Sequence, residues 1–248
     1  MTTGVHQTLG RMSPMSNHYW YRKRREVANL LSRHVHHADR IVDLGAGVGK
    51  DLALLASLFP SAEILAIDGS RESVEEINAR FSENSRVRGE LGDLRERLPL
   101  EDATFDLGYC SEVLEHMPEP AVLLAEACRI IKPGGFLLVT TPNEPNVFQK
   151  NFWRKGKADA PHVSQNGDAE LFGHISLGTV KEWDAALARA GFELVDFARG
   201  AIMYGGREWL DREGVLAAFF AAEAIFDRAP RKLGRSLSDQ VIGLYRRP

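Results

Sequence analysis

The sequence has only two cysteines, Cys110 and Cys128, among its 248 residues. Two thiols in apolar surroundings exclude a disulfide framework, and their separation lacks the paired spacing of a zinc site. No apolar run approaches the roughly 20 residues that a membrane span needs, and the first residues lack a basic-then-apolar signal pattern. The formal net charge of −3 is unlike that of a general nucleic-acid binder, which is usually basic. We therefore expect a cytoplasmic protein that does not span a membrane, and the charge disfavours nucleic acid as its partner.

Short apolar runs alternate with helical patterns along most of the chain. The strand-length runs cover residues 40–44, 62–67, 86–91, 104–110, 135–141, 192–197 and 240–246. Apolar residues at three- and four-residue spacing predict helices over residues 17–37, 50–59, 71–81, 121–131, 176–190 and around 207–228. This order predicts an α/β fold with a seven-stranded, mostly parallel sheet and helices on both faces.

The ends and two long connections stand apart from this alternation. We expect residues 1–38 to form a tail and a helix on the substrate side, and residues 39–248 to form the main domain. The insertions at 142–175 and 198–239 are long enough to be lids or caps. Four consecutive basic residues, 22–25, are expected on a solvated helix face, with a phosphate-binding patch as the alternative. Apolar residues within 215–226 suit either a lid or a homodimer interface.

A glycine-rich turn follows the first expected strand. Residues 41–49 read IVDLGAGVG, with glycines at positions 45, 47 and 49. Glycine lets the backbone turn sharply and approach a ligand without an intervening Cβ. A dinucleotide fingerprint would require its third glycine at Lys50, so the spacing disfavours a pyrophosphate ligand. Asp43, just before the turn, suits a ligand that carries positive charge.

Acidic residues follow the second and third expected strands. Asp68 ends the second strand, where a carboxylate can accept hydrogen bonds from both hydroxyls of a ribose. Asp93 follows the third strand, where an acidic side chain can bind an adenine amino group. The spacing of these acids and of the glycine turn predicts a nucleoside site at the ends of the strands.

These segments, with Phe105-Asp106 and Lys132-Pro133-Gly134-Gly135, resemble the class I S-adenosylmethionine-dependent methyltransferases over about residues 39–197. The resemblance implies a Rossmann-like sheet with S-adenosylmethionine at the carboxyl ends of its strands. The cofactor-binding residues that it implies are Asp43, Gly45, Gly47, Asp68, Gly69, Asp93, Leu94 and Ser111.

A group of candidate metal ligands follows the fourth expected strand. Glu112, Glu115 and His116 have the spacing that places side chains on one side of a helical turn. Such a set suits Mg²⁺ or Mn²⁺. The segment resembles the metal-binding part of the ubiquinone-pathway O-methyltransferases and the small-RNA terminal 2′-O-methyltransferases. In the latter, a later histidine completes the site; His174, or alternatively His162, would do so here.

The same segment also occurs in methyltransferases without a metal. In that case His174 or His116 is the expected general base. With a metal, the ion would hold the acceptor oxygen and lower its pKa. Both routes favour oxygen as the methylated atom.

The leading interpretation is methylation of a hydroxyl group on a small molecule, such as a saccharide. Amino-group methyltransferases carry an Asn/Asp-Pro-Pro-aromatic motif after the fourth strand, and this chain does not. Three alternatives stay open: RNA ribose 2′-O-methylation, a nicotinamide-dependent oxidoreductase, and a cofactor-binding subunit without catalysis. The metal-like segment and the basic residues 22–25 motivate the RNA alternative.

Overall fold

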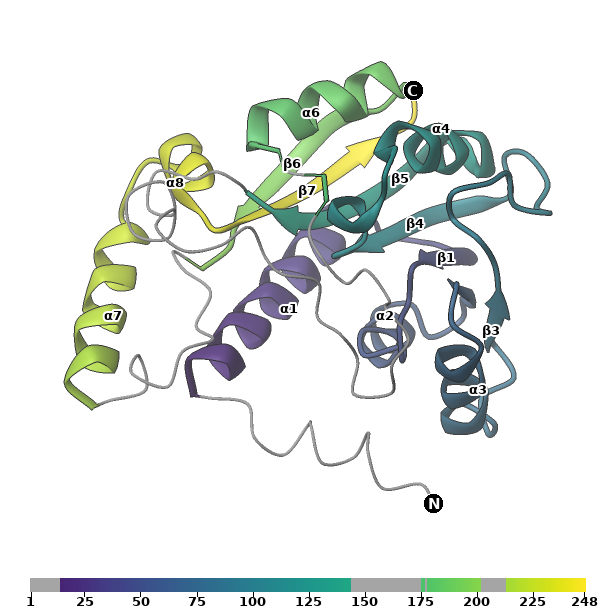
Figure 1. Ribbon diagram of the computed structural model, residues 1–248, viewed down its shortest axis with the longest axis horizontal. Helices are drawn as coiled ribbons and strands as arrows, with labels where there is room; N and C mark the ends of the chain where they lie inside the picture. The colour runs from purple at the N-terminus through teal and green to yellow at the C-terminus, as the bar shows by residue number, and fades with distance from the viewer. Residues whose placement is uncertain (1–13, 144–174, 177, 202–212) are drawn as a thin grey trace.

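The computed structural model describes residues 14–143, 175–176, 178–201 and 213–248 (Figure 1). Its strands are β1 Arg40–Leu44, β2 Glu63–Asp68, β3 Val87–Leu91, β4 Phe105–Ser111, β5 Ile131–Pro142, β6 Glu193–Arg199 and β7 Gln240–Arg246. Its helices are α1 Pro14–His34, α2 Leu52–Leu58, α3 Arg71–Arg80, α4 Pro120–Ile130, α6 Val180–Arg189, α7 Glu213–Phe226 and α8 Arg231–Leu237. A short 3₁₀ helix, η2, covers Leu114–His116.

The strands form one sheet in the order β3-β2-β1-β4-β5-β7-β6. Neighbours from β3 to β5 are parallel, whereas β7 is antiparallel to both β5 and β6. The chain runs outward from β1 to β3 and then returns to place β4 beside β1. Such a reversal in an α/β sheet opens a crevice at the carboxyl ends of the two central strands. The predicted seven-stranded, mostly parallel sheet is confirmed.

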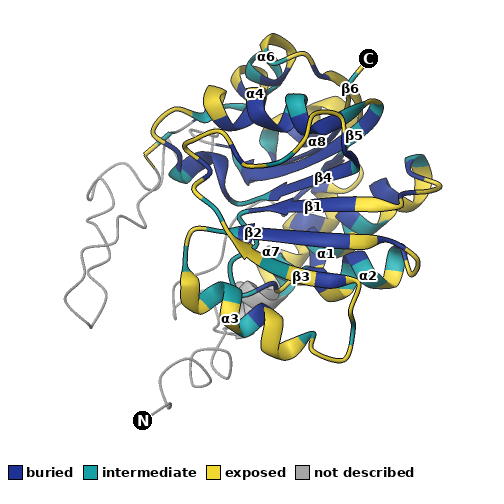
Figure 2. Cartoon of the chain, turned by 90° about the vertical axis from the view of Figure 1, so that its right-hand side faces the viewer, coloured by how far each residue is buried: buried dark blue, intermediate teal, exposed yellow. Residues whose placement is uncertain are grey.

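Two apolar cores cover the two faces of the sheet. Successive strand residues point to opposite faces, so Leu137 and Val139 of β5 join one core and Leu138 joins the other. The first core contains residues of α4 and α6, and the second contains residues of α1, α2 and α3. Figure 2 shows the central strands as buried, with the exposed residues concentrated on the helices and loops.

The element boundaries differ from the predicted ones at several ends. Helix α1 stops at His34 instead of residue 37, and α6 starts at Val180 instead of residue 176. The start of α6 is set by a capping box, in which the side chains of Thr179 and Glu182 each bond the other's backbone N–H. Strand β5 begins at Ile131, four residues earlier than predicted, because Ile131 already pairs with Phe105 of β4.

The insertions are described only in part. Residues 144–174 of the first insertion and 202–212 of the second lie outside the described residues. The described part of the second insertion contains α7 and also α8, which has no predicted counterpart because its seven residues are too short for a clear period. The division into residues 1–38 and 39–248 stays a prediction.

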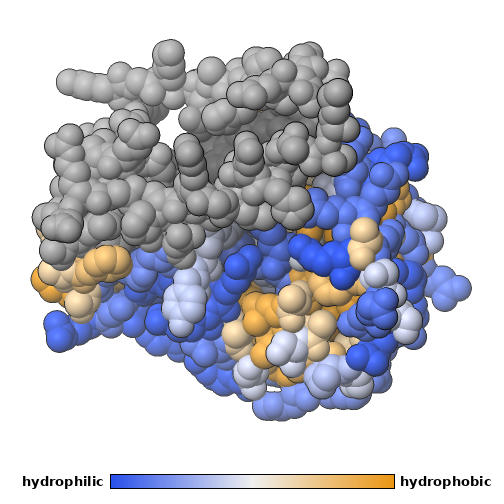
Figure 3. All heavy atoms as spheres, turned by 90° about the horizontal axis from the view of Figure 1, so that it is seen from below, coloured by the Kyte–Doolittle hydropathy of each residue, from blue (hydrophilic) through white to orange (hydrophobic). Residues whose placement is uncertain are grey.

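Helix α7 presents apolar side chains to solvent. Phe220 is 42% exposed and Ile225 is 69% exposed, and apolar residues gather on this side of the molecule in Figure 3. This surface is compatible with the predicted homodimer, which stays a prediction. Within the described ranges, no helix is both long and apolar enough to cross a membrane.

The buried β5 strand allows a direct test of the fold. Leu138 is fully buried between neighbouring strands β4 and β7. Leu138→Ala removes apolar contacts and leaves a cavity, so we expect the free energy of unfolding in urea to fall by about 2–5 kcal/mol. The matched change Val122→Ala, at a partly exposed position of α4, should alter it by less than about 0.5 kcal/mol. Similar losses for both variants would contradict the assignment of β5 to the centre of the core.

Candidate cofactor and acceptor site

The glycine turn between β1 and α2 has the left-handed backbone that only glycine adopts readily. The φ angles are +81° at Gly45 and +51° at Gly47. A Cβ on Gly45 would lie 2.5 Å from Cγ2 of Val113, whereas a Cβ on Gly47 would meet no atom within 4 Å. Gly45 is therefore required by close packing, and Gly47 faces open space that a ligand can occupy.

Asp68, at the end of β2, holds this turn in place. Its Oδ2 accepts a 2.7 Å hydrogen bond from the backbone N–H of Gly47, and its Oδ1 accepts a 2.9 Å bond from the N–H of Ser70. The N–H groups of Gly45 and Ala46 also donate to the carbonyl oxygen of Ile67, at 2.8 and 3.0 Å. A carboxylate has about four acceptor positions, so each oxygen of Asp68 keeps one for a ligand hydroxyl.

The remaining predicted cofactor residues lie at the same edge of the sheet. Asp43 pairs with Tyr109 of β4, and Ser111 lies two residues after Tyr109, toward the carboxyl end of that strand. Asp68 pairs with Leu91 of β3, and Asp93 lies two residues after Leu91. Asp93 is exposed, and the Arg95 side chain lowers the pKa of its carboxyl to about 2. Leu94 is buried in the core beneath α4, and the exposed Gly69 lies next to the Gly92 carbonyl.

Asp43 is deeply buried at this edge, with a relative exposure of 3%. Burial raises its pKa well above the ordinary value, and the negative charge of Asp51 raises it further. The ammonium of Lys23 has the opposite effect but does not cancel the shift. Burial and the charge of Asp51 thus both disfavour the ionised form of Asp43, and a positive charge close to it would favour that form.

Lys23 of α1 is a site residue that sequence reasoning missed. Its side chain is only 2% exposed, and Nζ donates a 2.8 Å hydrogen bond to Oγ of Ser111 and lies 3.5 Å from Oδ2 of Asp51. Asp51 also accepts from Arg24 at 2.7 Å and from the Tyr109 hydroxyl at 2.9 Å. Burial raises the pKa of Asp51, but these partners outweigh it and lower the pKa below its ordinary value.

The expectation that residues 22–25 lie on a solvated face is therefore wrong for two of the four. Arg22 and Lys23 are buried, and Arg22 pairs with Glu223 and Asp227. The signal was the helical period itself. Counting back in fours from the buried Val27 reaches Lys23 and then the buried Tyr19.

The predicted convergence of Glu112 and Glu115 is also wrong. Oε1 of Glu112 accepts from the Thr140 hydroxyl and from Nε2 of Gln240, both at 2.8 Å. Oε2 of Glu115 accepts from the hydroxyl of Thr141 at 2.9 Å. Thr140 and Thr141 are consecutive in β5, so their side chains, and the carboxylates bound to them, lie on opposite faces of the sheet. The cause is the φ angle of +58° at Glu112, which prevents a regular helical turn.

The structure does not support the predicted metal site. Among the described residues, no three histidine, cysteine, aspartate or glutamate side chains lie close enough together to hold an ion. His116 lies in η2, while His174 and His162 lie outside the described residues. The backbone N–H of Ile175, the residue after His174, donates a 2.8 Å bond to the carbonyl oxygen of Glu115.

The fold is that of a Rossmann-like α/β domain. At the point where its strand order reverses, it has a glycine turn and a carboxylate, Asp68, placed as in nucleoside-binding domains. A family described as "Methyltransferase domain" matches residues 42–139. Over these residues the chain is similar to the class I S-adenosylmethionine-dependent methyltransferases, and the relatives below share this likeness.

Three similar proteins illustrate the match. The trans-aconitate 2-methyltransferase of Methylobacterium radiotolerans is 32% identical over 152 residues, which are 61% of this chain and 56% of the relative. The 27-O-demethylrifamycin SV methyltransferase of Amycolatopsis mediterranei is 31% identical over 164 residues, or 62% of this chain and 54% of the relative. The chain thus spans about half the length of these relatives.

The third is a solved structure, the complex between the Haloferax volcanii Trm112 methyltransferase activator and a methyltransferase. The matched chain superposes with a TM-score of 0.65 at 20% identity, covering 98% of this chain and 95% of that one. At this identity the likeness establishes the fold alone.

The buried Asp43 predicts a specific dependence of stability on pH. Its raised pKa means that the folded state binds the proton more tightly than the unfolded chain, so stability is present at low pH and is lost as pH rises through the folded-state pKa. Asp43→Asn mimics the neutral form and should not suffer this loss. In urea titrations, we expect the stability of Asp43→Asn relative to the natural protein to be greater at pH 8 than at pH 5.

The control for this titration is Glu63→Gln, a change at an exposed carboxyl at the start of β2. Its effect on stability should differ little between the two pH values. An Asp43→Asn effect that is equal at both pH values would show that Asp43 is already ionised in the folded protein.

Proposed function

We propose that the protein transfers a methyl group from S-adenosylmethionine to an oxygen atom of a small molecule. The observation that carries this proposal is the 2.7 Å bond between Asp68 and Gly47, with open space beside Gly47. This arrangement offers a ligand two oriented carboxylate oxygens and a bare backbone at one place. A nucleoside with a free ribose and no phosphate fits both features.

When it is bound, S-adenosylmethionine supplies a methyl group on a positively charged sulfur, which is its own leaving group. The protein's residues then have to bind and orient. Asp68 would accept the ribose hydroxyls, and Asp93 would accept from the adenine amino group, with Leu94 next to it in the chain. Asp43 and Ser111 would face the methionine end, where the positive charges of the ligand would favour the ionised form of Asp43.

The acceptor atom is inferred to be oxygen. The sequence after β4 is Ser111-Glu112 and lacks the Pro-Pro-aromatic motif of amino-group methyltransferases. One relative carries O-methylation chemistry in its name, 27-O-demethylrifamycin SV methyltransferase. A hydroxyl acceptor needs a group to take its proton, and His116 and His174 stay candidates for this role. That the acceptor is a saccharide stays a prediction.

Glu112 is a third candidate base, and the structure favours it among the described residues. Its left-handed backbone costs of order 1–3 kcal/mol, and strain of this kind gathers at functional sites. Thr140 and Gln240 hold one of its carboxylate oxygens, which fixes the direction of the other at the edge beside Ser111. The proposed mechanism uses no metal, because Glu112 and Glu115 do not converge.

The RNA alternative loses part of its support. Arg22 and Lys23, two of the four basic residues that motivated it, are buried in contacts within the protein. The nicotinamide alternative gains none, because the glycine spacing and the family match both point to the methyl donor.

Asp68→Asn tests the cofactor site. The change removes the negative charge while keeping the shape, so hydrogen bonds to the ribose lose their charged acceptor. We expect the affinity for S-adenosylhomocysteine, measured by calorimetry, to fall about 10- to 100-fold. Asp39→Asn, the same change at the other edge of the sheet, should bind normally. No binding of either the methyl donor or its product to the natural protein would refute the proposed function.

Glu112→Gln tests the proton acceptor. With a panel of hydroxylated acceptors, we expect the rate of S-adenosylhomocysteine formation to fall at least about 100-fold, with an unchanged affinity for S-adenosylhomocysteine. Glu119→Gln, an exposed change in the same loop, is the control. Retained turnover in Glu112→Gln, with loss in His116→Gln or His174→Gln, would move the role to that histidine. Loss of turnover on chelation would restore the metal hypothesis.

A further inference from the structure

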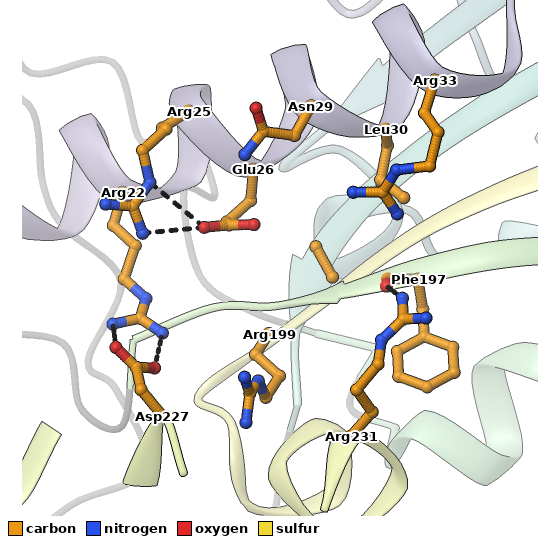
Figure 4. A pocket seen from close by; sticks show the side chains of 11 residues that line it. Arg22, Arg25, Glu26, Asn29, Leu30, Arg33, Phe197, Arg199, Asp227 and Arg231 are labelled. Carbon is orange, nitrogen blue, oxygen red and sulfur yellow. Dashed lines mark hydrogen bonds and ion pairs between the residues drawn. The ribbon is translucent and has the colours of Figure 1, made fainter. Parts of the chain in front are cut away.

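Helix α1, strand β6 and the segment from α7 to α8 enclose a cavity of about 470 Å³. Figure 4 shows α1 on one side of this cavity, with Arg199 of β6 and Arg231 of α8 on the other. A volume in the range of about 300–1,000 Å³ is typical of small-molecule sites. None of its lining residues belongs to the proposed cofactor or acceptor site.

The wall of the cavity is basic. Its charged side chains are Arg22, Arg25, Arg33, Arg199 and Arg231, against Glu26 and Asp227. Two further carboxylates, Glu223 and Asp196, pair with arginines of the wall, so five guanidiniums face four carboxylates. A concave surface with an excess of one sign of charge attracts ions of the opposite sign.

Two of these arginines keep hydrogen-bond donors that the described residues do not satisfy. Arg22 is 4% exposed; its two terminal nitrogens donate to Glu223 and Asp227, but its buried Nε has no partner. Arg199 donates through Nη1 alone, to the carbonyl oxygens of Phe226 and Ala229. A guanidinium has five N–H groups, and leaving a buried donor unpaired is costly.

The other three arginines form a more accessible rim. The side chains of Arg25, Arg33 and Arg231 are 49%, 54% and 56% exposed, and they pair with Glu26 or Asp196. The Arg25–Glu26 pair is exposed enough to contribute little to stability, so Arg25 can turn toward a ligand at small cost. Asp196 is only 11% exposed, but Arg33 and Arg231 each bind it through one terminal nitrogen, so their other N–H groups can bind a ligand without breaking these pairs.

We propose that this cavity binds a compact small molecule that carries at least two oxyanion groups. The planar guanidinium group binds carboxylates and phosphates in the same bidentate geometry. The oxyanion groups can therefore be carboxylates or phosphates, and the experiment below tests each. The site does not depend on methyl transfer and would exist in a protein with a different activity. It would bring a second small molecule onto α1, the helix that also supplies Lys23 to the edge of the sheet.

The test is calorimetric titration of the full chain with citrate and with inorganic pyrophosphate, each against sodium chloride at equal ionic strength. We expect saturable binding of at least one of the two. Binding of citrate alone assigns carboxylates, and binding of pyrophosphate alone assigns phosphate groups. If neither anion saturates the protein, the proposal fails.

Variants locate the binding. Arg199→Gln should weaken the anion about tenfold or more. Because Arg199 packs against Gly234, the rim changes Arg25→Gln and Arg33→Gln provide a second test with little risk to folding. Arg88→Gln, an exposed change on β3 at the opposite edge of the sheet, is the control. Natural affinity in all three cavity variants would place the anion elsewhere and overturn the assignment.

The same samples are titrated with S-adenosylhomocysteine. The cavity variants should retain this binding, and Asp68→Asn should retain anion binding. Failure of the anion site and failure of the methyltransferase proposal therefore give different results.

Discussion

The turn from β1 into α2 must be held against the end of β2 for the nucleoside edge to exist. Three backbone N–H groups of the turn, those of Gly45, Ala46 and Gly47, bond to the carbonyl of Ile67 and to the carboxylate of Asp68. The acid proposed to hold the ribose is thus the acid that holds the glycine turn. The side chain of Val113 packs against Gly45 on the other side of the turn. Any side chain at position 45 would therefore displace Val113.

Helix α1 supplies the charge balance for this edge. Asp43 is buried there and Asp51 is largely covered, and burying carboxylates without a partner is costly. Lys23 and Arg24 of α1 bring cations to Asp51, while the adjacent Arg22 binds Glu223 of α7 and Asp227 just beyond it. The helix therefore joins the proposed cofactor edge to the α7–α8 region and to the basic cavity. Loss of α1 would leave Asp51 without its cationic partners.

The alternation of side chains along β5 separates groups that are close in the sequence. Thr140 draws Glu112 toward the face covered by α1, and Thr141 holds Glu115 beneath α4. As a result, Glu112, Ser111 and Gln240 share one polar cluster, whereas Glu115 lies buried on the other face. Glu112 and Glu115 have the sequence spacing of metal ligands, but in the folded protein they lie on opposite faces of the sheet.

Local patterns alone determined the strands, their parallel arrangement and the glycine and acid positions at their ends, because strand periodicity and the conformational freedom of glycine depend on neighbouring residues only. Only the tertiary structure decided that Lys23 is buried against Ser111, that Gln240 reaches Glu112 across 128 residues, and that five arginines surround one cavity. Each of these depends on how α1, β7 and α8 pack against the sheet. The helical spacing places Lys23 on the buried face of α1, but which residue of a distant element it meets is a property of the folded chain.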